Sequence, residues 1–312
     1  MINSKLMPEQ VHLDTETALA EAIQSKVQKT HSMKRKKIIS NSLTYLLLVV
    51  LCLVWITPIA AVFMVSIRNE TGTATNLIPL TGYTWDNYIN LLTSDTYPFL
   101  LWFRNTLLVA VFVMIISTIF VFSVAYTMSR LRFKGRRGLM NINLVLGMFP
   151  GFMSMIAVYN ILKAMGISGS LIALILIYSA GSGGGFYIAK GFFDTISKSL
   201  DEAARIDGAN NFKVFYKIIL PLSKPIIVYT LLTSFMGPWV DYIYCSIILR
   251  TETDNYTVAL GLYNMINSLD TYQLNYTMFF AGSVLISIPI MILFLLTQKY
   301  YVAGVTGGSV KG

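Results

Sequence analysis

The sequence predicts an all-α membrane protein with six transmembrane helices. Hydrophobic residues make up 55% of the 312-residue chain and charged residues only 12%, whereas about a quarter of the residues in soluble domains are charged. The apolar residues gather in six long runs, each close to the roughly 20 residues that a helix needs to cross a bilayer and too long for a buried strand. The predicted spans are residues 43–67, 107–129, 142–162, 171–189, 226–249 and 278–296.

The distribution of Lys and Arg predicts the orientation of the chain in the membrane. Twenty of the 24 basic residues lie in the N-terminal tail, the 130–141 loop, the 190–225 loop and the C-terminal tail. Cytoplasmic loops carry an excess of Lys and Arg, so these segments and both termini are predicted to be cytoplasmic. The segments predicted to be outside hold only Arg68, Arg104, Lys163 and Arg250.

The same pattern divides the chain into parts. Residues 1–37 are predicted to form a cytoplasmic tail, 38–300 a six-span domain and 301–312 a second cytoplasmic tail. The outer segment 68–103 is rich in Tyr and Trp, which fits either an aromatic belt at the membrane surface or a docking surface for an extracellular partner. The outer segment 250–277 is long for a simple connection, and we expect it to contact such a partner.

The composition excludes several classes of function. The net charge of +9 follows from membrane topology and faces anionic lipid headgroups; no basic, aromatic soluble domain exists to bind nucleic acid. Cys52 and Cys245 fall inside predicted spans, and His12 and His31 lie in the tail without ligand spacing. We therefore predict neither a disulfide nor a metal site.

Glycine pairs at helical spacing predict close packing of helices. These pairs are Gly147 with Gly151 and Gly181 with Gly185. The glycine run 181–185 lacks the Lys-Ser/Thr of a phosphate-binding loop, and the chain contains no G-x-x-x-x-G-K-[ST] sequence. We predict no ATP site of that kind and no cofactor for this chain.

A carboxylate inside the fifth predicted span marks a candidate translocation path. Asp241 follows Pro238, which bends a helix, and ionisable residues in spans are functional by default. Trp239, Tyr242 and Tyr244 add flat apolar faces with polar tips, which suit the C–H faces and hydroxyl edges of a sugar. The alternative is that Asp241 only makes a hydrogen bond between helices.

A polar hairpin, DEAARIDGANNFKVFYKIILPLSKP, occupies residues 201–225 between the fourth and fifth predicted spans. Acidic residues such as Glu202 favour a helix N-terminus, and Gly208 favours its end. Pro221 ends a second amphipathic segment, and Pro225 suits the first turn of the next span. The predicted shape is a short helix, a sharp bend and a second helix, which together fit a groove on another protein.

The hairpin resembles the EAA motif of binding-protein-dependent ABC importer permeases. The pattern E-A-A-x-x-D-G-A is followed by F and by L-P-x-x-x-P, and the resemblance covers residues 40–312. Segments 149–159 and 235–241 are similar to the six-span second membrane subunit of Gram-positive maltose/maltodextrin importers. Ser197 stands where the family often has proline. The motif residues are Glu202, Ala203, Ala204, Asp207, Gly208 and Ala209, followed by Phe215, Leu220, Pro221 and Pro225.

The resemblance implies a type I ABC importer permease fold in a bacterial plasma membrane. It also implies a partner set: a second permease subunit, two cytoplasmic ATPase subunits that bind the ATP, and an extracellular sugar-binding protein. The motif helix would dock in a cleft on one ATPase and convert its closure into movement of the spans. This chain is then not an enzyme, and a maltodextrin-type sugar is its expected cargo.

Two other classes of function compete with this interpretation. An ion-coupled secondary transporter needs titratable groups at mid-membrane, and Asp241 is the one clear case in the predicted spans. A membrane enzyme needs paired carboxylates or a nucleophile beside a base, and the predicted spans contain no histidine. A requirement for an ATPase partner separates the three classes.

Overall fold

The structure is a computed structural model that describes residues 37, 40–70, 72, 82–148, 151–250, 252–267 and 272–307. The chain divides into two compact units, Met1–Ala61 and Val62–Gly312. Residues 1–36, which make up nearly all of the predicted N-terminal tail, lie outside the described residues, as do residues 308–312.

An apolar helix of 27 residues, Ser40–Ser66, begins in the first unit. Its hydroxyl groups bond within the helix: Thr44 donates to the carbonyl of Ser40 at 2.9 Å, and Thr57 donates to that of Leu53 at 2.7 Å. Lipid offers no hydrogen-bond partners, so internal bonds of this kind suit a spanning helix. The first predicted span is therefore confirmed as one continuous apolar helix.

The second unit is helical throughout its described residues, apart from turns and an isolated bridge between Arg68 and Tyr83. Its three longest helices are α3 (Phe99–Arg130), α11 (Lys224–Val240) and α14 (Tyr272–Gly307). The shorter elements are α2 (Asp86–Thr93), α4 (Arg136–Gly147), α5 (Gly151–Ala164), α6 (Leu171–Gly181), η1 (Ser182–Gly185), α7 (Phe186–Thr195), α8 (Lys198–Ile206), α9 (Asn211–Val214), η2 (Phe215–Ile219), α10 (Leu220–Leu222), α12 (Ile243–Leu249), η3 (Thr253–Asn255) and α13 (Val258–Asn267).

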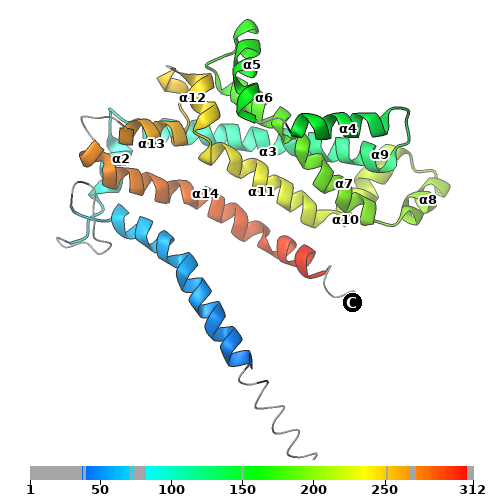
Figure 1. Cartoon of the computed structure of the whole chain (residues 1–312), viewed down its shortest axis with the longest axis horizontal. Helices are drawn as coiled ribbons and strands as arrows, with labels where there is room; N and C mark the ends of the chain where they lie inside the picture. Colours follow the sequence, from blue (N-terminus) through cyan, green and yellow to red (C-terminus); the bar gives the residue numbers. More distant parts are fainter. Residues whose placement is uncertain are drawn as a thin grey trace, which may run out of the picture. The chain divides into compact units, whose positions relative to one another are not determined.

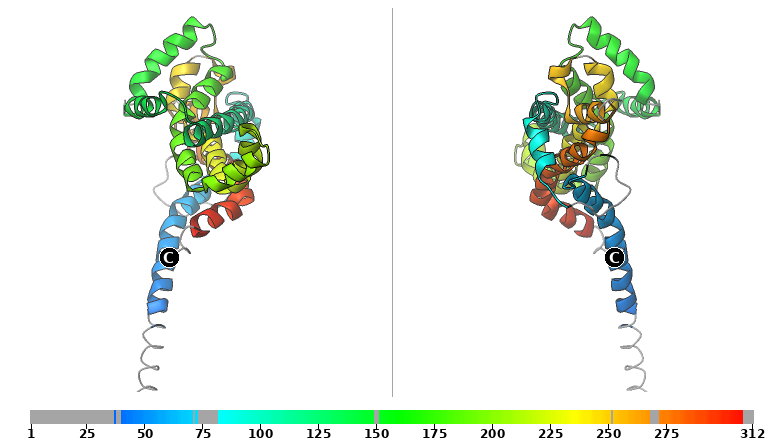
Figure 2. Two further views of the ribbon diagram at one scale, coloured as in Figure 1. Left: turned by 90° about the vertical axis from the view of Figure 1, so that its right-hand side faces the viewer. Right: turned by 90° about the vertical axis from the view of Figure 1, so that its left-hand side faces the viewer.

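Helix α3 is the central element of the second unit. It packs against α6, α7 and α11, and α11 packs in turn against α14, as Figures 1 and 2 show. Three buried apolar clusters follow one another along α3, containing Trp102, Val113 and Phe122 respectively. The length of α3 therefore joins the α13 end of the unit to the α8 end.

Three of the six predicted spans form single long helices, and the fourth and fifth are each divided into two helices. The third falls on α4 and α5, and residues 149–150 between them lie outside the described residues. Ser40–Ser66, Phe99–Arg130 and Asn275–Tyr300 are long and apolar enough to cross a membrane. Counting each of two bent helix pairs as one span gives at most five among the described residues, with a shorter apolar helix at Met153–Ala164. The count of six spans therefore stays a prediction.

The interruptions have local causes. The fifth predicted span breaks between α11 and α12, where Asp241 adopts an extended conformation (ψ 103°). Pro238 lies one turn before this break and removes a backbone donor from the helix. The fourth predicted span changes to a 3₁₀ turn at η1, where three of the four residues are glycine. Glycine weakens a helix interior by about 1 kcal/mol relative to alanine.

The predicted close packing at the glycine pairs was mostly wrong. No atom of the described residues lies within 4 Å of the position that a Cβ would take at Gly147, Gly151 or Gly181. Gly185 is the exception, with a Val121 methyl group 3.6 Å from that position. The glycines at 181 and 185 instead border open space, because both line a cavity in the second unit.

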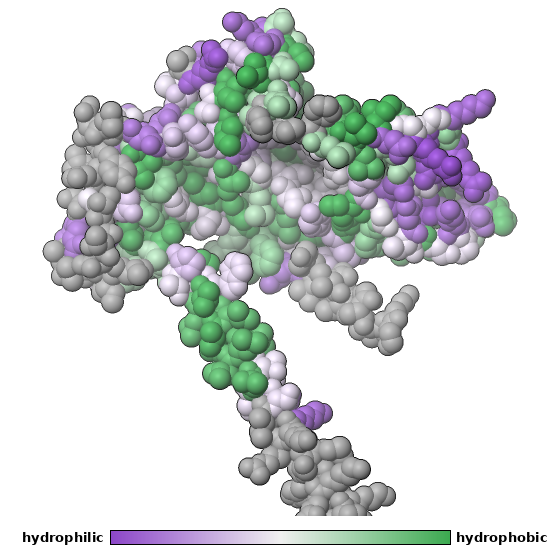
Figure 3. Space-filling view, viewed as in Figure 1, coloured by the Kyte–Doolittle hydropathy of each residue, from purple (hydrophilic) through white to green (hydrophobic). Residues whose placement is uncertain are grey.

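Hydrophilic residues gather at one end of the second unit, over α8 and the turn between α3 and α4 (Figure 3). That turn supplies Arg132, Lys134, Arg136 and Arg137. The long apolar helices run away from this end, so the hairpin that contains α8 lies where the apolar surface stops.

Candidate functional site

Helix α8 forms where the motif predicts it. It runs from Lys198 to Ile206 and begins at Ser197, whose hydroxyl accepts a hydrogen bond from the Ser199 amide at 3.3 Å. The cap is therefore Ser197, the position at which the sequence departs from the motif that it resembles. The helix ends as predicted: Gly208 has φ +79°, and the Ala209 amide donates to the Ala204 carbonyl at 2.9 Å.

The six predicted coupling residues divide between two faces of the hairpin. Glu202, Ala203, Asp207 and Gly208 are exposed. Ala204 and Ala209 are partly buried against the apolar cluster that contains Phe122. Of the two alanines predicted to form a slim face, Ala203 is exposed and Ala204 is partly buried. The coupling role of the six residues stays a prediction.

Large apolar side chains project from this hairpin. Ile206 is 87% exposed and Phe212 73% exposed, and Leu200 and Tyr216 also lie open. The rings of Phe212 and Tyr216 are stacked, with an interplanar angle of 4°. Contiguous exposed apolar groups rimmed by charge are typical of protein interaction sites.

Arg130 anchors the hairpin to the end of α3. Its Nε lies 3.2 Å from Oδ2 of Asp201 in α8, and the two side chains are only 2% and 9% exposed. Its Nη2 donates to the carbonyls of Phe193 and Ile196 at 2.9 Å each. One buried guanidinium therefore ties α3 to the end of α7 and to the first turn of α8.

Further polar contacts reinforce this anchor. The Tyr126 hydroxyl donates to the Asn211 carbonyl at 2.9 Å, and Nη2 of Arg205 donates to the Asn211 side chain at 2.9 Å. Ser129 donates to Asp194 at 2.6 Å. Sequence reasoning treated Arg130 as a topology signal alone, because charge counts cannot show which basic residue is buried.

The four predicted path residues lie around the break between α11 and α12. Trp239 is 1% exposed, edge-on to Phe103 with ring centroids 5.1 Å apart. The Asp241 carboxylate accepts a hydrogen bond from the Tyr244 amide at 3.0 Å and so caps α12. The ring centroids of Tyr242 and Tyr263 are 3.8 Å apart, and those of Tyr244 and Tyr178 are 6.3 Å apart.

A polar cavity lies on the α11 side of α3. Its volume is about 280 Å³, and its hydroxyl-bearing residues come from α3, α6, η1 and α11. Six residues of α11 line it. Five of them carry a hydroxyl or are glycine, and their spacings of one, three or four residues place them on one helical face. Sequence reasoning missed this stripe of hydroxyl and glycine residues, although its spacing could have revealed it. The stripe is Tyr229, Thr230, Thr233, Ser234 and Gly237.

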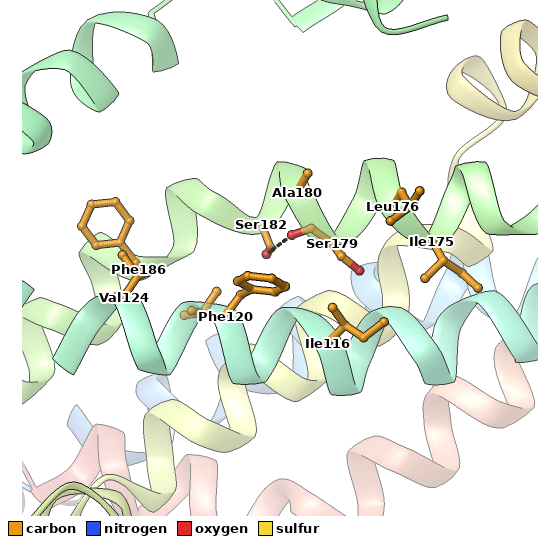
Figure 4. A pocket seen from close by; sticks show the side chains of 10 residues that line it. Ile116, Phe120, Val124, Ile175, Leu176, Ser179, Ala180, Ser182 and Phe186 are labelled. Atoms are coloured by element: carbon orange, nitrogen blue, oxygen red, sulfur yellow. Dashed lines mark hydrogen bonds between the residues drawn. The ribbon is translucent and has the colours of Figure 1, made fainter. Parts of the chain in front are cut away.

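A second cavity, of about 380 Å³, lies between α3 and the α6–η1 segment (Figure 4). Its walls are mostly apolar, with Phe120, Ile175 and Leu176 among them. Ser182 donates to the Ser179 carbonyl at 2.6 Å beside it. A predominantly apolar lining suits a lipid tail or another helix better than a polar ligand.

Comparison with known families decides the identity of the fold. The family model of the binding-protein-dependent transport system inner membrane component matches residues 122–307. The chain belongs to this family. The matched region contains the hairpin and most of the polar cavity, and the family consists of transport permeases, so the chain is not an enzyme.

Relatives along the whole chain confirm the predicted carbohydrate branch. The galactooligosaccharides transport system permease protein GanQ of Bacillus subtilis is 36% identical, over 90% of this chain and 99% of the relative. The maltodextrin transport system permease protein MalD of Streptococcus pneumoniae is 35% identical, over 90% and 99%. The maltodextrin permease MdxG of B. subtilis is 34% identical, over 88% and 98%.

Solved structures share the fold. A bacterial ABC transporter that imports the acidic polysaccharide alginate matches with a TM-score of 0.69 at 23% identity, over 86% of this chain and 98% of that chain. A bacterial alginate transporter in complex with its alginate pentasaccharide-bound periplasmic protein matches with a TM-score of 0.60 at 17% identity, over 84% and 94%.

Proposed function

We propose that this chain is a membrane subunit of an ATP-driven importer of neutral oligosaccharides, and that α8 couples it to an ATPase. The observation that carries the proposal is the anchored hairpin, which matches the family motif and exposes Ile206 and Phe212. Its relatives, named for galactooligosaccharides and maltodextrins, support this class of sugar. The remaining members are a second permease subunit, two ATPase subunits and an extracellular sugar-binding protein.

The hairpin acts as a docking surface that has little side-chain bulk at Ala203 and large apolar side chains beside it. Glu202, Ala203, Asp207 and Gly208 face away from the protein, so a cleft on the ATPase can approach the α8 backbone at Ala203. Ile206 supplies an apolar contact whose burial contributes about 1.5–3 kcal/mol to docking. Ala204 and Ala209 hold the hairpin to the permease from behind.

The anchor at Arg130 carries displacement of α8 to the membrane helices. Asp201 and the ends of α3 and α7 meet at the Arg130 guanidinium. A displacement of α8 therefore either breaks these contacts or moves α3. Since α3 contains 32 residues and rises about 1.5 Å per residue, it reaches the opposite side of the second unit. Movement of the ATPase at α8 can therefore be transmitted along α3 to the membrane helices.

The break at Asp241 is the proposed gate region of the translocation path. Tyr242 and Tyr244 are partly exposed beside it, and they offer ring faces and hydroxyls to a passing sugar. Trp239 supports this region from the buried side. The outer segment 250–277 is proposed to contact the extracellular sugar-binding protein, with both termini of the chain in the cytoplasm.

A substitution on the free face of α8 tests the coupling role. Ala203→Arg should hold the ATPase away from the α8 backbone and lower ATP hydrolysis and sugar uptake together by at least about tenfold, corresponding to about 1.4 kcal/mol of docking energy. Ala164→Arg, at an exposed alanine near the end of α5, is the matched control. Both variants are assayed as reconstituted complexes with their subunit stoichiometry.

Parental hydrolysis and uptake in Ala203→Arg would remove the coupling role. A secondary transporter is distinguished in the same assay, because sugar uptake that continues without ATP and ATPase subunits would replace the importer interpretation.

A further inference from the structure

The polar cavity beside α11 has a lining suited to an uncharged polyol. We propose that it is a subsite on this chain for one sugar ring of the cargo and that it selects neutral over acidic sugars; this deepens the proposed function and rests on it. No charged residue is among the described residues that line the cavity. The lining hydroxyls are Ser117, Tyr178, Ser182, Tyr229, Thr230, Thr233 and Ser234.

Ser117 gives the first independent indication of a ligand. It lies on α3 with 0% exposure, lines the cavity, and its hydroxyl has no hydrogen-bond partner among the described residues. Leaving a buried polar group unsatisfied costs about 1–3 kcal/mol. A hydroxyl of a bound sugar would supply the missing hydrogen bond and offset that cost.

Helix α11 presents hydrogen-bond acceptors to the same space. Thr230 donates to the Ile226 carbonyl and Thr233 to the Tyr229 carbonyl, at 2.9 Å each. Their protons are used within the helix, but their oxygen lone pairs can still accept hydrogen bonds. Pro238 has no N–H, so the carbonyl of Ser234 loses its usual helical donor. These acceptors suit sugar hydroxyls, which can donate to them.

Glycines make room for the ring. Among the described residues, no atom lies within 4 Å of the position that a Cβ would take at Gly181 or Gly237, and at Gly185 a Val121 methyl group lies 3.6 Å from that position. The cavity volume of about 280 Å³ is near the lower limit of roughly 300 Å³ for small-molecule pockets. This size fits a single ring unit of an oligosaccharide rather than a coiled chain.

The neutral lining sets the charge preference. A carboxylate transferred into a cavity without a cationic partner loses its hydration at high cost. A uronate unit would face this cost here, whereas a hexose unit would not. The fold is shared with an importer of the acidic polysaccharide alginate, so the difference in cargo must come from side chains rather than from the arrangement of helices.

The test separates the subsite from a packing role through Ser117→Ala. This change removes an unpaired buried hydroxyl, so the protein should fold at least as well as the parent. We expect sugar uptake at saturating binding protein and maltotriose or β-1,4-galactotriose to fall about 3- to 10-fold, the effect of one hydrogen bond. Thr118→Ala is the matched control, because the Thr118 hydroxyl donates a hydrogen bond to the Met114 carbonyl. It should leave sugar uptake at the parental level.

Protection from chemical modification provides a second measurement. In reconstituted complexes in which Cys52 and Cys245 of this chain are replaced by alanine, a Thr233→Cys variant should react more slowly with a small thiol reagent when maltotriose or β-1,4-galactotriose is present. Trigalacturonate should give no protection. Equal protection by trigalacturonate would overturn the selection of neutral sugars.

The outcomes also separate the subsite from the proposed function. If the parent transports neither neutral sugar, the proposed function fails and the subsite fails with it. If the parent transports one of them but Ser117→Ala behaves like the parent and Thr233→Cys is not protected, the subsite is wrong and the proposed function stands. If Ser117→Ala and Thr118→Ala lose uptake equally, packing of α3 is the cause and the subsite is overturned.

Discussion

Arg130 contributes to the predicted membrane orientation and also anchors α8 to α3. It counts toward the basic excess that orients the chain, yet its side chain is 2% exposed and bonded to Asp201. Taking two charges out of water is costly, so a buried pair adds little net stability, but leaving one member alone costs about 3–5 kcal/mol. The pair therefore fixes the position of α8 more than it stabilises the whole chain.

A double-mutant cycle on this pair measures that effect. Arg130→Met and Asp201→Leu should each destabilise the hairpin by about 3–5 kcal/mol, because each strands a buried charge. The double variant should recover much of the loss. Thermal unfolding in detergent, with proteolysis of the hairpin as a local measure, checks this. Single variants that unfold like the parent would show that the ion pair does not hold α8.

Gly208 offers a second test at the scale of one residue. Its φ is +79° and no atom lies within 4 Å of a built Cβ, so backbone conformation alone decides which residue fits. Gly208→Val should cost more than 1–2 kcal/mol, roughly the penalty of a left-handed residue, while Gly208→Asn should cost less because Asn tolerates this region. Hairpin proteolysis rates rank the variants. Equal rates for Val and Asn would contradict a conformational cause.

At the scale of elements, sequence reasoning predicted the motif hairpin well and the spans less well. The hairpin was predictable because its signals are local: a polar first turn, Gly208, and Pro225 at the second position of α11. The position at which a spanning helix breaks depends on which hydrogen-bond partners are available to the backbone N–H and C=O groups at the break. Hydropathy treats 226–249 as one run, while Pro238 and the cap at Asp241 divide it into two helices.

The polar cavity beside α11 could not be predicted from the sequence either, because it depends on which helices pack together. Its lining comes from segments far apart in the sequence, with Ser117 on α3 and Gly181 and Thr233 on other helices. A sequence shows the stripe on α11 but not the helix that faces it. Sequence reasoning placed the path at Asp241, because a charged residue in a predicted span indicates function, whereas an uncharged hydroxyl does not.

Asp241 has a structural role that can be tested directly. Its carboxylate accepts the Tyr244 amide at 3.0 Å, and loss of an N-terminal cap costs about 0.5–2 kcal/mol. Asp241→Leu should weaken α12 by this amount, and Asp241→Asn, which caps equally well, should not. Hydrogen exchange of the α12 amides measures the difference. If Asn destabilises α12 as much as Leu does, the negative charge rather than the cap is what matters.

At the scale of the whole molecule, the two ends of the second unit have different chemistry. The end with α8 and the α3–α4 turn is hydrophilic and basic (Figure 3). The other end holds the aromatic outer segment, where Trp85 is 63% exposed. The proposed function requires an ATPase on one side and a binding protein on the other, which agrees with this polarity. The positive-inside rule predicts that the basic end is cytoplasmic.

Site-directed thiol labelling tests this orientation. Asp95 and Lys213 are exposed at opposite ends of the second unit, and a cysteine at either position can report its side of the membrane once Cys52 and Cys245 are replaced by alanine. In intact cells, a membrane-impermeant reagent should label Asp95→Cys and leave Lys213→Cys unmodified. After permeabilisation both should react, which controls for accessibility. Because twenty basic residues lie on the predicted inner side and four on the outer, reversal would require a strong opposing signal. Labelling of Lys213→Cys alone in intact cells would place the hairpin outside and make coupling to a cytoplasmic ATPase impossible.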